Sequence, residues 1–234
     1  MNTSNRRRIY LMRHGSVTYF DDHGRPHLPE QVPLNAQGRA QASAAGKVFA
    51  AENLHFDRVI VSGLPRTVET ANLVLAETGQ DIALEHWPEL VELQGGKLST
   101  IPDADLKDAF IGAFEGVVPE QKQFLGGETI GELLDRIHPG IDKLRADKSW
   151  DTVLLVLHGG VNRAVLSYAL TGQRLFLGNL AQTAGCINAL DVGEAPHDWV
   201  VRIVNYSPPS QLQTASRDTT METLLKQYQK FRNA

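Results

Sequence analysis

The segment TVLLVLHGG, from Thr152 to Gly160, constrains the fold of this chain more than any other. After Thr152 it has five consecutive valine and leucine residues, followed by a histidine and two glycines. Successive side chains of a strand point to opposite faces, so a strand here buries both of its faces. A continuous apolar run of this kind is typical of a central strand in a parallel sheet.

Strand-like and helix-like segments alternate along the rest of the chain. Asn35 is placed to cap a helix that carries Ala42, Ala45 and Phe49 along one side. Strands are expected at 9–12, 59–61, 82–84, 152–160, 189–192 and 199–204, and further helices at 66–78 (ended by Gly79), 128–144 and 161–170. The alternation predicts an α/β fold, a three-layer α/β/α sandwich with a mostly parallel central sheet.

The chain is expected to form one domain over residues 1–234, because no internal repeat or low-complexity linker divides it. Residues 94–127 break the alternation and are interpreted as an inserted cap, a kind of segment that often carries substrate contacts. Pro139 is expected to kink or break the helix over 128–144. The tail over 218–232 has apolar residues near helical spacing. We expect it to pack on the domain or on a second subunit, so a homodimer is one expected assembly.

The composition argues against nucleic-acid and membrane partners. The sequence has 23 Lys plus Arg against 27 Asp plus Glu, a net charge of −4, and neither sign forms a long run. No apolar run approaches the roughly 20 residues that cross a bilayer. The only cysteine, Cys186, excludes an internal disulfide and a Cys-rich metal site, which fits a reducing cytoplasm. Cys186 is expected to be a small buried residue.

Two of the expected strands end in the same way. The first strand leads into Arg13-His14-Gly15, and the apolar run of TVLLVLHGG ends in His158 followed by Gly159. Ligands bind at the carboxyl ends of strands in open α/β sheets. The glycines have no Cβ, which allows backbone N–H groups and a ligand to approach closely. Arg66 opens a helix after the strand at 59–61, and a helix N-terminus with an arginine favours an anion.

These residues occur within motifs that resemble the histidine phosphatase superfamily, the phosphoglycerate mutase-like proteins. The motifs are RHG at 13–15, PLNAQGRAQA at 33–42, SGLPRTVETA at 62–71, ELVELQGG at 89–96, GETIGELLDR at 127–136 and LHGGVNRAVL at 157–166. They follow the order found in the family and span most of the chain. An RHG motif alone is weak evidence for this family, whereas six motifs in the family's order make a chance match unlikely.

The resemblance implies a phosphate pocket formed by Arg13, Arg66 and His158, with His14 as nucleophile. It also implies an acidic proton donor. We assign Glu92, because the family's glutamate lies four residues before a glycine and that glycine is Gly96 here. Glu89 is the competing assignment.

The residue types fit phosphoryl transfer without a metal ion or cofactor. A phosphate monoester carries nearly two negative charges, and its displacement needs cations around the equatorial oxygens. A neutral imidazole is a nucleophile that divides hydrolysis into two easier steps. The sequence has no His-Glu-x-x-His motif, no cysteine pair and no P-loop lysine. A cluster of acidic and histidine residues is interpreted as a solvated turn in preference to a metal site: Asp21, Asp22, His23 and His27.

The sequence also departs from the family pattern. Ser16-Val17-Thr18-Tyr19-Phe20 follows Gly15 where relatives have an acidic residue, Ser or Thr and then Asn, and Thr18 is the candidate substitute. Leu98-Ser99-Thr100 stands where many small-molecule phosphatases read Trp-Glu-Gly, so a different substrate side is expected. The histidines at 55, 86, 138 and 197 are assigned to the surface.

Three functions remain open at this point. A phosphatase acting on a small phosphomonoester is favoured. A phosphoglycerate mutase using the same histidine is second, because the longer aromatic stretch after RHG and the extended cap of the mutases are not visible. A non-catalytic module that binds phosphorylated ligands is third, because every position of the core motif set is present.

Overall fold

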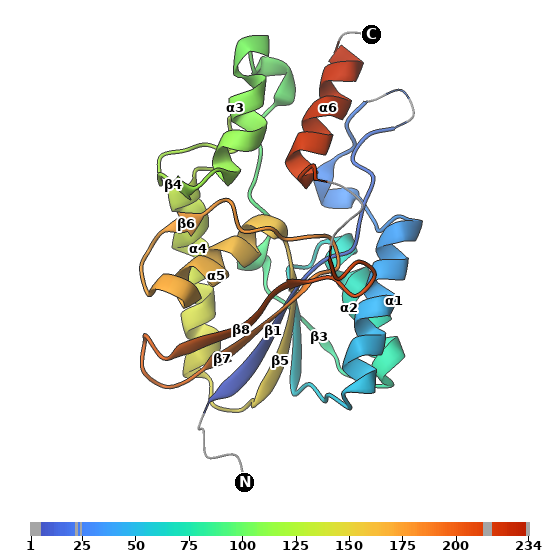
Figure 1. Cartoon of the computed structure of the whole chain (residues 1–234), viewed down its shortest axis with the longest axis vertical. Coiled ribbons are helices and arrows are strands. Elements are labelled where there is room, and N and C mark those ends of the chain that lie inside the picture. The colour runs from blue at the N-terminus through green and yellow to red at the C-terminus, as the bar shows by residue number, and fades with distance from the viewer. Residues whose placement is uncertain (1–5, 22, 24, 213–216, 233–234) are drawn as a thin grey trace.

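The computed structural model describes residues 6–21, 23, 25–212 and 217–232. A six-stranded sheet runs in the order β3-β2-β5-β1-β7-β8 (Figure 1). Its strands are β1 (Arg7–Arg13), β2 (Arg58–Val61), β3 (Leu84–His86), β5 (Thr152–Leu157), β7 (Ile187–Val192) and β8 (Trp199–Tyr206). β3, β2, β5 and β1 are mutually parallel, whereas β7 pairs antiparallel with β1 and with β8. The mostly parallel sheet with β5 in its interior confirms the predicted fold class.

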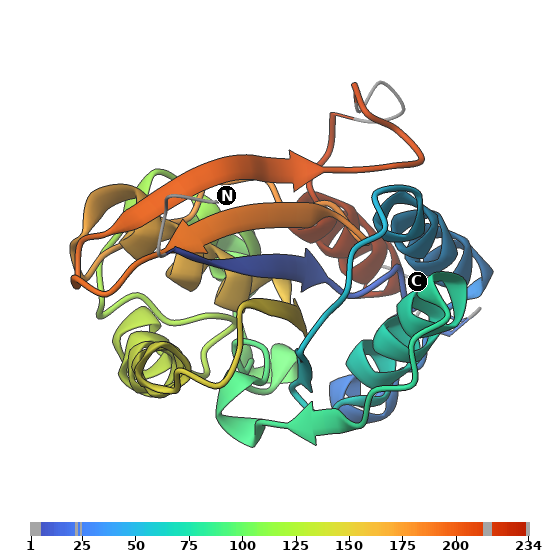
Figure 2. The same ribbon diagram turned by 90° about the horizontal axis from the view of Figure 1, so that it is seen from below.

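Helices cover both faces of this sheet, as Figure 2 shows from below. α1 (Ala36–Ala51) and α2 (Pro65–Thr78) lie on one side, and α4 (Ile130–Ala146) and α5 (Gly159–Thr171) lie on the other. The side chains of β1 alternate between two hydrophobic clusters. Ile9 and Leu11 join the cluster of α4 and α5, while Tyr10 and Met12 join that of α1 and α2. This double burial explains why the inner strands are apolar on both faces.

Local capping determines where the helices begin and end. The Asn35 side chain accepts a hydrogen bond from the Gly38 N–H at 2.8 Å and so caps α1, as predicted. Gly79 ends α2 in the left-handed conformation with φ of 65°. Thr129 and Glu132 form a reciprocal capping box at the start of α4.

Several features of the elements differ from the sequence prediction, and those near Pro139, the third strand and α5 are described here. Pro139 lies inside α4, which continues from Ile130 to Ala146 without a break. The apolar side of α4 packs in the core, and this burial offsets the hydrogen bond that proline cannot donate. The third strand lies two residues later than expected, at Leu84–His86. α5 begins at Gly159 and not at Val161, so its first turn directly follows His158.

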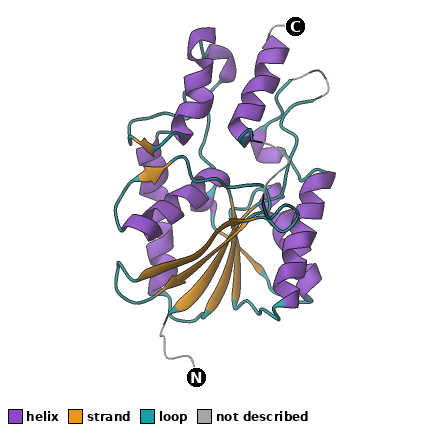
Figure 3. Cartoon of the chain, viewed as in Figure 1, coloured by secondary structure: helices purple, strands orange, loops and turns teal. Residues whose placement is uncertain are grey.

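Residues 94–127 form a cap of short elements above the carboxyl ends of the strands (Figure 3). They include α3 (Leu106–Ile111) and β4 (Val117–Val118), which pairs with β6 (Phe176–Leu177). α6 (Thr220–Arg232) lies beside α3 (Figure 1), and the rings of Tyr228 and Phe110 stack at 5.8 Å. The tail therefore docks on this chain's own cap, one of the two expected positions. Among the described residues, no helix combines the length and apolarity needed to span a membrane.

Candidate active site

The parallel pairing of β1 and β5 brings two histidines together. Arg13 is opposite Leu157 in the register, so His14 and His158 leave the sheet side by side. Their ring centroids are 5.2 Å apart, with an interplanar angle of 67°. Both side chains are buried, with relative exposures of 2% and 0%. The strand-end juxtaposition expected from the sequence is thus present.

The His14 ring is held in one tautomer. Its Nδ1 lies 2.7 Å from the carbonyl oxygen of Gly15, and a carbonyl can only accept. Nδ1 therefore carries the proton and donates it, which leaves the lone pair on Nε2. Burial lowers the pKa of His14 well below its usual value, and the nearby charges of Arg66 and Arg13 lower it further. The ring is neutral at pH 7 and is suited to act as a nucleophile.

His158 is anchored through its other nitrogen. Its Nε2 lies 2.8 Å from the Ser62 hydroxyl, which itself lies 3.2 Å from the Thr67 hydroxyl. Burial lowers the pKa of His158 well below its usual value, followed by the effects of His14, Arg66 and Arg13. Within the described residues, its buried Nδ1 has no hydrogen-bond partner.

Two buried arginines complete the cluster. Arg13 donates through Nη1 to the Gln182 carbonyl at 2.5 Å and to the Thr220 hydroxyl at 3.1 Å, and Arg66 donates to the Pro29 carbonyl at 2.5 Å. Their relative exposures are 8% and 2%, and neither buried Nε has a partner within the part of the chain described here. Unpaired buried donors are costly. An oxyanion would supply the acceptors that these groups need.

A buried amide network supports Arg13, and sequence reasoning missed it. Asn162 donates to the Gln182 side-chain oxygen at 3.0 Å, and Gln182 donates to Asn188 at 3.0 Å. The network fixes the position of Gln182, whose backbone carbonyl accepts the hydrogen bond from Arg13. Asn162 follows His158 by one helical turn within LHGGVNR, a spacing that places both on one face. No comparable signal marked Gln182.

The structure places the two competing glutamates differently. Glu92 Oε1 accepts from the backbone N–H of Leu93 at 2.9 Å and of Gly160 at 3.0 Å, so its carboxylate lies at the N-terminus of α5. Glu89 faces α4, where its carboxylate lies 3.8 Å from Lys143 Nζ. Of the two glutamates, Glu92 therefore lies beside the end of β5, close to the point where His158 follows that strand.

The glycines serve packing in a way that the sequence did not indicate. A Cβ on Gly15 would lie 2.3 Å from the Gly38 carbonyl oxygen, so this glycine lets the start of α1 approach β1. The Gly15 N–H donates to the Thr70 hydroxyl at 3.1 Å. The Gly15 N–H is thus paired within the protein. A Cβ on Gly159 would lie 3.4 Å from Arg13 Nε and 3.2 Å from Arg163 Nη1.

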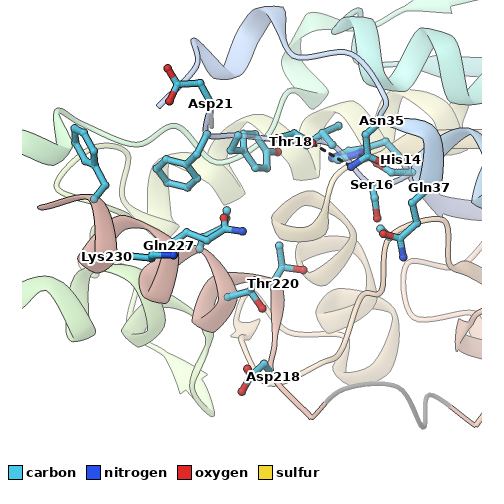
Figure 4. Close-up of a pocket in the computed structure, with 18 of the residues that line it drawn as sticks. His14, Ser16, Thr18, Asp21, Asn35, Gln37, Asp218, Thr220, Gln227 and Lys230 are labelled. Carbon is cyan, nitrogen blue, oxygen red and sulfur yellow. Dashed lines mark hydrogen bonds between the residues drawn. The ribbon is translucent and has the colours of Figure 1, made fainter. Parts of the chain in front are cut away.

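A cleft of about 860 Å³ opens over Arg13 and His14 (Figure 4). It is lined by residues 13–21, by Asn35 and Gln37, and by one side of α6, whereas Arg66, His158 and Glu92 are not among its lining residues. No residue of the cap over 94–127 lines this cleft either. The cleft is thus lined by α6 and not by the 94–127 segment that was expected to carry substrate contacts. Thr18 lines the cleft and accepts a hydrogen bond from Asn35 at 3.3 Å.

The remaining candidates lie elsewhere or have local roles. Asp21 accepts from the backbone N–H groups of His23 and Arg25, both at 2.8 Å, which forms a turn. Asp22 lies outside the described residues. No group of three or more His, Cys, Asp or Glu residues able to hold a metal occurs in the described part of the chain. Cys186 is buried, and burial raises the pKa of its thiol to about 11.

The surface assignment holds for three of the four remaining histidines. The exposed ones are His55, His86 and His197. His138 is half-buried on the side of α4 that faces α5, and the centroid of its ring lies 5.2 Å from that of Tyr168 on α5. Its surface assignment was wrong, because the helical spacing did not show that α5 covers this side of α4.

Comparison with known proteins agrees with this arrangement. The sequence profile of the histidine phosphatase superfamily (branch 1) matches residues 9–206. The adenosylcobalamin/alpha-ribazole phosphatase of Salmonella typhimurium is 29% identical over 80% of this chain and 91% of its own length. The probable phosphoglycerate mutase GpmB of Salmonella paratyphi A is 31% identical over 64% of this chain and 69% of its own.

Solved structures show the same likeness. A mycobacterial glucosyl-3-phosphoglycerate phosphatase, solved as a complex with VO3, is 26% identical and has a TM-score of 0.65 over 85% of this chain and 99% of its own. Mycobacterial hydrolase 1 is 25% identical, with a TM-score of 0.69 over 86% of this chain and 99% of its own. The chain belongs to the histidine phosphatase superfamily, an assignment that supports phosphatase or mutase activity.

Proposed function

We propose that this protein is a metal-independent phosphatase that hydrolyses a small phosphomonoester through a phosphohistidine on His14. The observation that carries the proposal is the His14 ring, whose Nδ1 donates to the Gly15 carbonyl at 2.7 Å and whose pKa is held low by burial and two arginines. A buried neutral imidazole with its free lone pair on Nε2 needs no separate base to attack phosphorus.

In the first step, Nε2 of His14 forms a bond to phosphorus while the bond between phosphorus and the ester oxygen breaks. Glu92, as the general acid, gives a proton to the departing oxygen, which leaves as an alcohol. The ring gains positive charge, which the Gly15 carbonyl at Nδ1 stabilises. In the second step, water attacks phosphorus, Glu92 takes up a proton from that water, and phosphate leaves neutral His14.

The buried donors supply the charge stabilisation that this transfer needs. Arg13 and Arg66 each have an Nε–H without a partner within the described residues, and His158 has an unpaired Nδ1 there. If the Ser62 hydroxyl donates to His158 Nε2, the neutral ring carries its proton on Nδ1 and is a third donor. Donors arranged in advance at a buried site are usually the largest contribution to this kind of catalysis.

The second candidate is a mutase that returns the phosphoryl group from His14 to its product. The similarity to a probable phosphoglycerate mutase favours it, over 64% of this chain. The hydrolase is preferred because the likeness to the alpha-ribazole phosphatase extends over 80% of the chain.

The test is a panel of phosphomonoesters, including 2- and 3-phosphoglycerate, assayed for released phosphate in excess chelator. The proposal predicts metal-independent release without exchange between the two phosphoglycerates. Exchange without net release would assign the mutase. Loss in His14→Ala of a phosphoenzyme that is labile to acid and stable to alkali, with inorganic phosphate still binding through the arginines, would support His14 as the nucleophile. Substantial activity in that variant would exclude it.

A further inference from the structure

One side of α6 forms a wall of the cleft. Thr220, Thr223, Gln227 and Lys230 all line it, and their spacing of three and four residues places them on one face of the helix. The other side packs on the cap through residues such as the buried Leu225 and Tyr228. The family match ends at residue 206, so this wall lies outside the part of the chain that carries the family pattern.

The cleft extends well beyond the reacting histidine. In Figure 4, His14, Ser16 and Asn35 lie at one end, and Gln227 and Lys230 lie toward the other. Its volume of about 860 Å³ is in the range of sites that hold drug-sized ligands, roughly 300 to 1,000 Å³. A phosphoryl group with a three-carbon acid would fill only a small part of it.

The chemistry of the lining indicates which leaving group fits. Amide and hydroxyl side chains come from both walls, and the aromatic residues among the lining are Tyr19, Phe20 and Phe231. Asp218 is paired with Lys226 at 2.5 Å, which leaves one cation, Lys230, and one carboxylate, Asp21, among the other acidic and basic residues at the distal end of the described lining. Such a wall has little excess positive charge to hold a second anionic group. It suits hydrogen-bonding groups and flat apolar faces.

We propose that α6 and the segment 16–21 form the binding site for the leaving group, and that this group is an uncharged ring bearing hydroxyls, of nucleoside or sugar size. Gln227, whose amide both donates and accepts, is the specificity-determining residue of this wall. The inference rests on the proposed phosphatase function, because it assigns the part of the substrate that departs from phosphorus at His14.

The experiment compares kcat/KM for four phosphomonoesters: a nucleoside 5′-monophosphate, a hexose 6-phosphate, glycerol phosphate and 3-phosphoglycerate. We expect the two bulky neutral leaving groups to exceed both small ones by about tenfold or more. Gln227→Ala should reduce the ratio of bulky to small substrate by about three- to tenfold, the effect of one or two lost hydrogen bonds. Gln229→Ala is the matched control, since Gln229 lies on the same helix but not in the cleft lining.

The outcomes separate this inference from the proposed function. If the wild-type protein hydrolyses none of the esters, the phosphatase proposal fails and this inference fails with it. If it hydrolyses them but Gln227→Ala and Gln229→Ala give the same substrate ratio, the α6 site is overturned while the phosphatase stands. A preference for 3-phosphoglycerate that Lys230→Ala removes would instead assign the distal end to an anion.

Discussion

The guanidinium of Arg136 makes a two-point ion pair with the carboxylate of Glu128, at 2.7 and 2.9 Å. Its N–H groups also donate to the carbonyl oxygens of Glu89, Val91 and Glu92, at 2.8, 2.6 and 3.1 Å. The pair is mostly buried, with side-chain exposures of 20% and 12%. One arginine on α4 thus fixes the backbone of the segment that carries Glu92.

Arg136→Lys should weaken this support, because an ammonium cannot reproduce the planar fork. We expect the free energy of unfolding to fall by about 1–3 kcal/mol, the cost of lost hydrogen bonds to charged groups. Because Arg136 positions the segment that carries Glu92, the proposed proton donor, Arg136→Lys should also lower the rate of the first phosphoryl transfer. The loss should be larger for an alkyl phosphate, whose leaving group needs a proton, than for p-nitrophenyl phosphate. Denaturant unfolding and single-turnover kinetics measure the two effects.

Arg174→Lys provides the control for that substitution. Arg174 makes a similar two-point pair with Glu120, at 2.9 Å, but the two side chains are 39% and 40% exposed. Exposed pairs contribute little, so its loss should cost less than about 1 kcal/mol. Equal effects of the two substitutions would show that Arg136 has no special role.

The inner strands and their helices were predictable because burial leaves a local pattern. Val153 to Leu157 have no polar residue, and the structure buries all of them between two helical layers. The Asn35 and Gly79 caps were predictable for the same reason, since a cap needs only its own few residues. Pro139 was misjudged, because its tolerance in α4 depends on distant core contacts.

The pairing of His14 and His158 was also predictable, because neighbouring parallel strands end at the same edge of the sheet. The cleft wall was not. It is made by α6 from beyond residue 219, packed on a cap from 94–127, and no local pattern reveals that long-range contact. Gln182 was missed because its role depends on its backbone carbonyl, which accepts a hydrogen bond from Arg13 across the fold.

Arg66→Lys should reduce kcat/KM for any phosphomonoester by about a hundredfold, the usual effect of removing one positioned donor from a charged transition state. The lysine keeps the charge but loses the planar fork that the proposal assigns to two phosphoryl oxygens. Arg39→Lys is the control, because Arg39 pairs with Glu69 and its side chain is 51% exposed. A loss below threefold for Arg66→Lys would place it outside the phosphoryl pocket.

Stability should fall as the pH decreases below about 6.5, the ordinary pKa of histidine. Burial lowers the pKa of His14 and His158 in the folded state, so below that pH the unfolded chain binds more protons. Each ring contributes a slope of up to about 1.4 kcal/mol per pH unit. Urea unfolding between pH 5 and 7 should therefore show a shallower slope in His158→Gln, and an unchanged slope in the exposed His55→Gln. Identical slopes in the wild type and His158→Gln would contradict a neutral buried ring.

Glu92→Gln tests the proton donor by its dependence on the leaving group. An alkoxide leaves badly without a proton, whereas p-nitrophenolate is stable near neutral pH. The first phosphoryl-transfer step should therefore slow by about 10²- to 10⁴-fold with an alkyl phosphate and far less with p-nitrophenyl phosphate. Burst or single-turnover kinetics must isolate that step, because in the proposed mechanism Glu92 also activates the water of the second step, and its loss there would slow both substrates alike.

Glu89→Gln is the matched control for this prediction, because Glu89 faces Lys143 on α4 while Glu92 receives the Gly160 N–H at the start of α5. Its burst rates should remain within about threefold of the wild type for both substrates, since a surface ion pair contributes little. A leaving-group dependence in Glu89→Gln, together with equal losses for both substrates in Glu92→Gln, would move the acid role to Glu89. That result would also require the 88–92 segment to turn away from the Arg136 contacts when substrate binds.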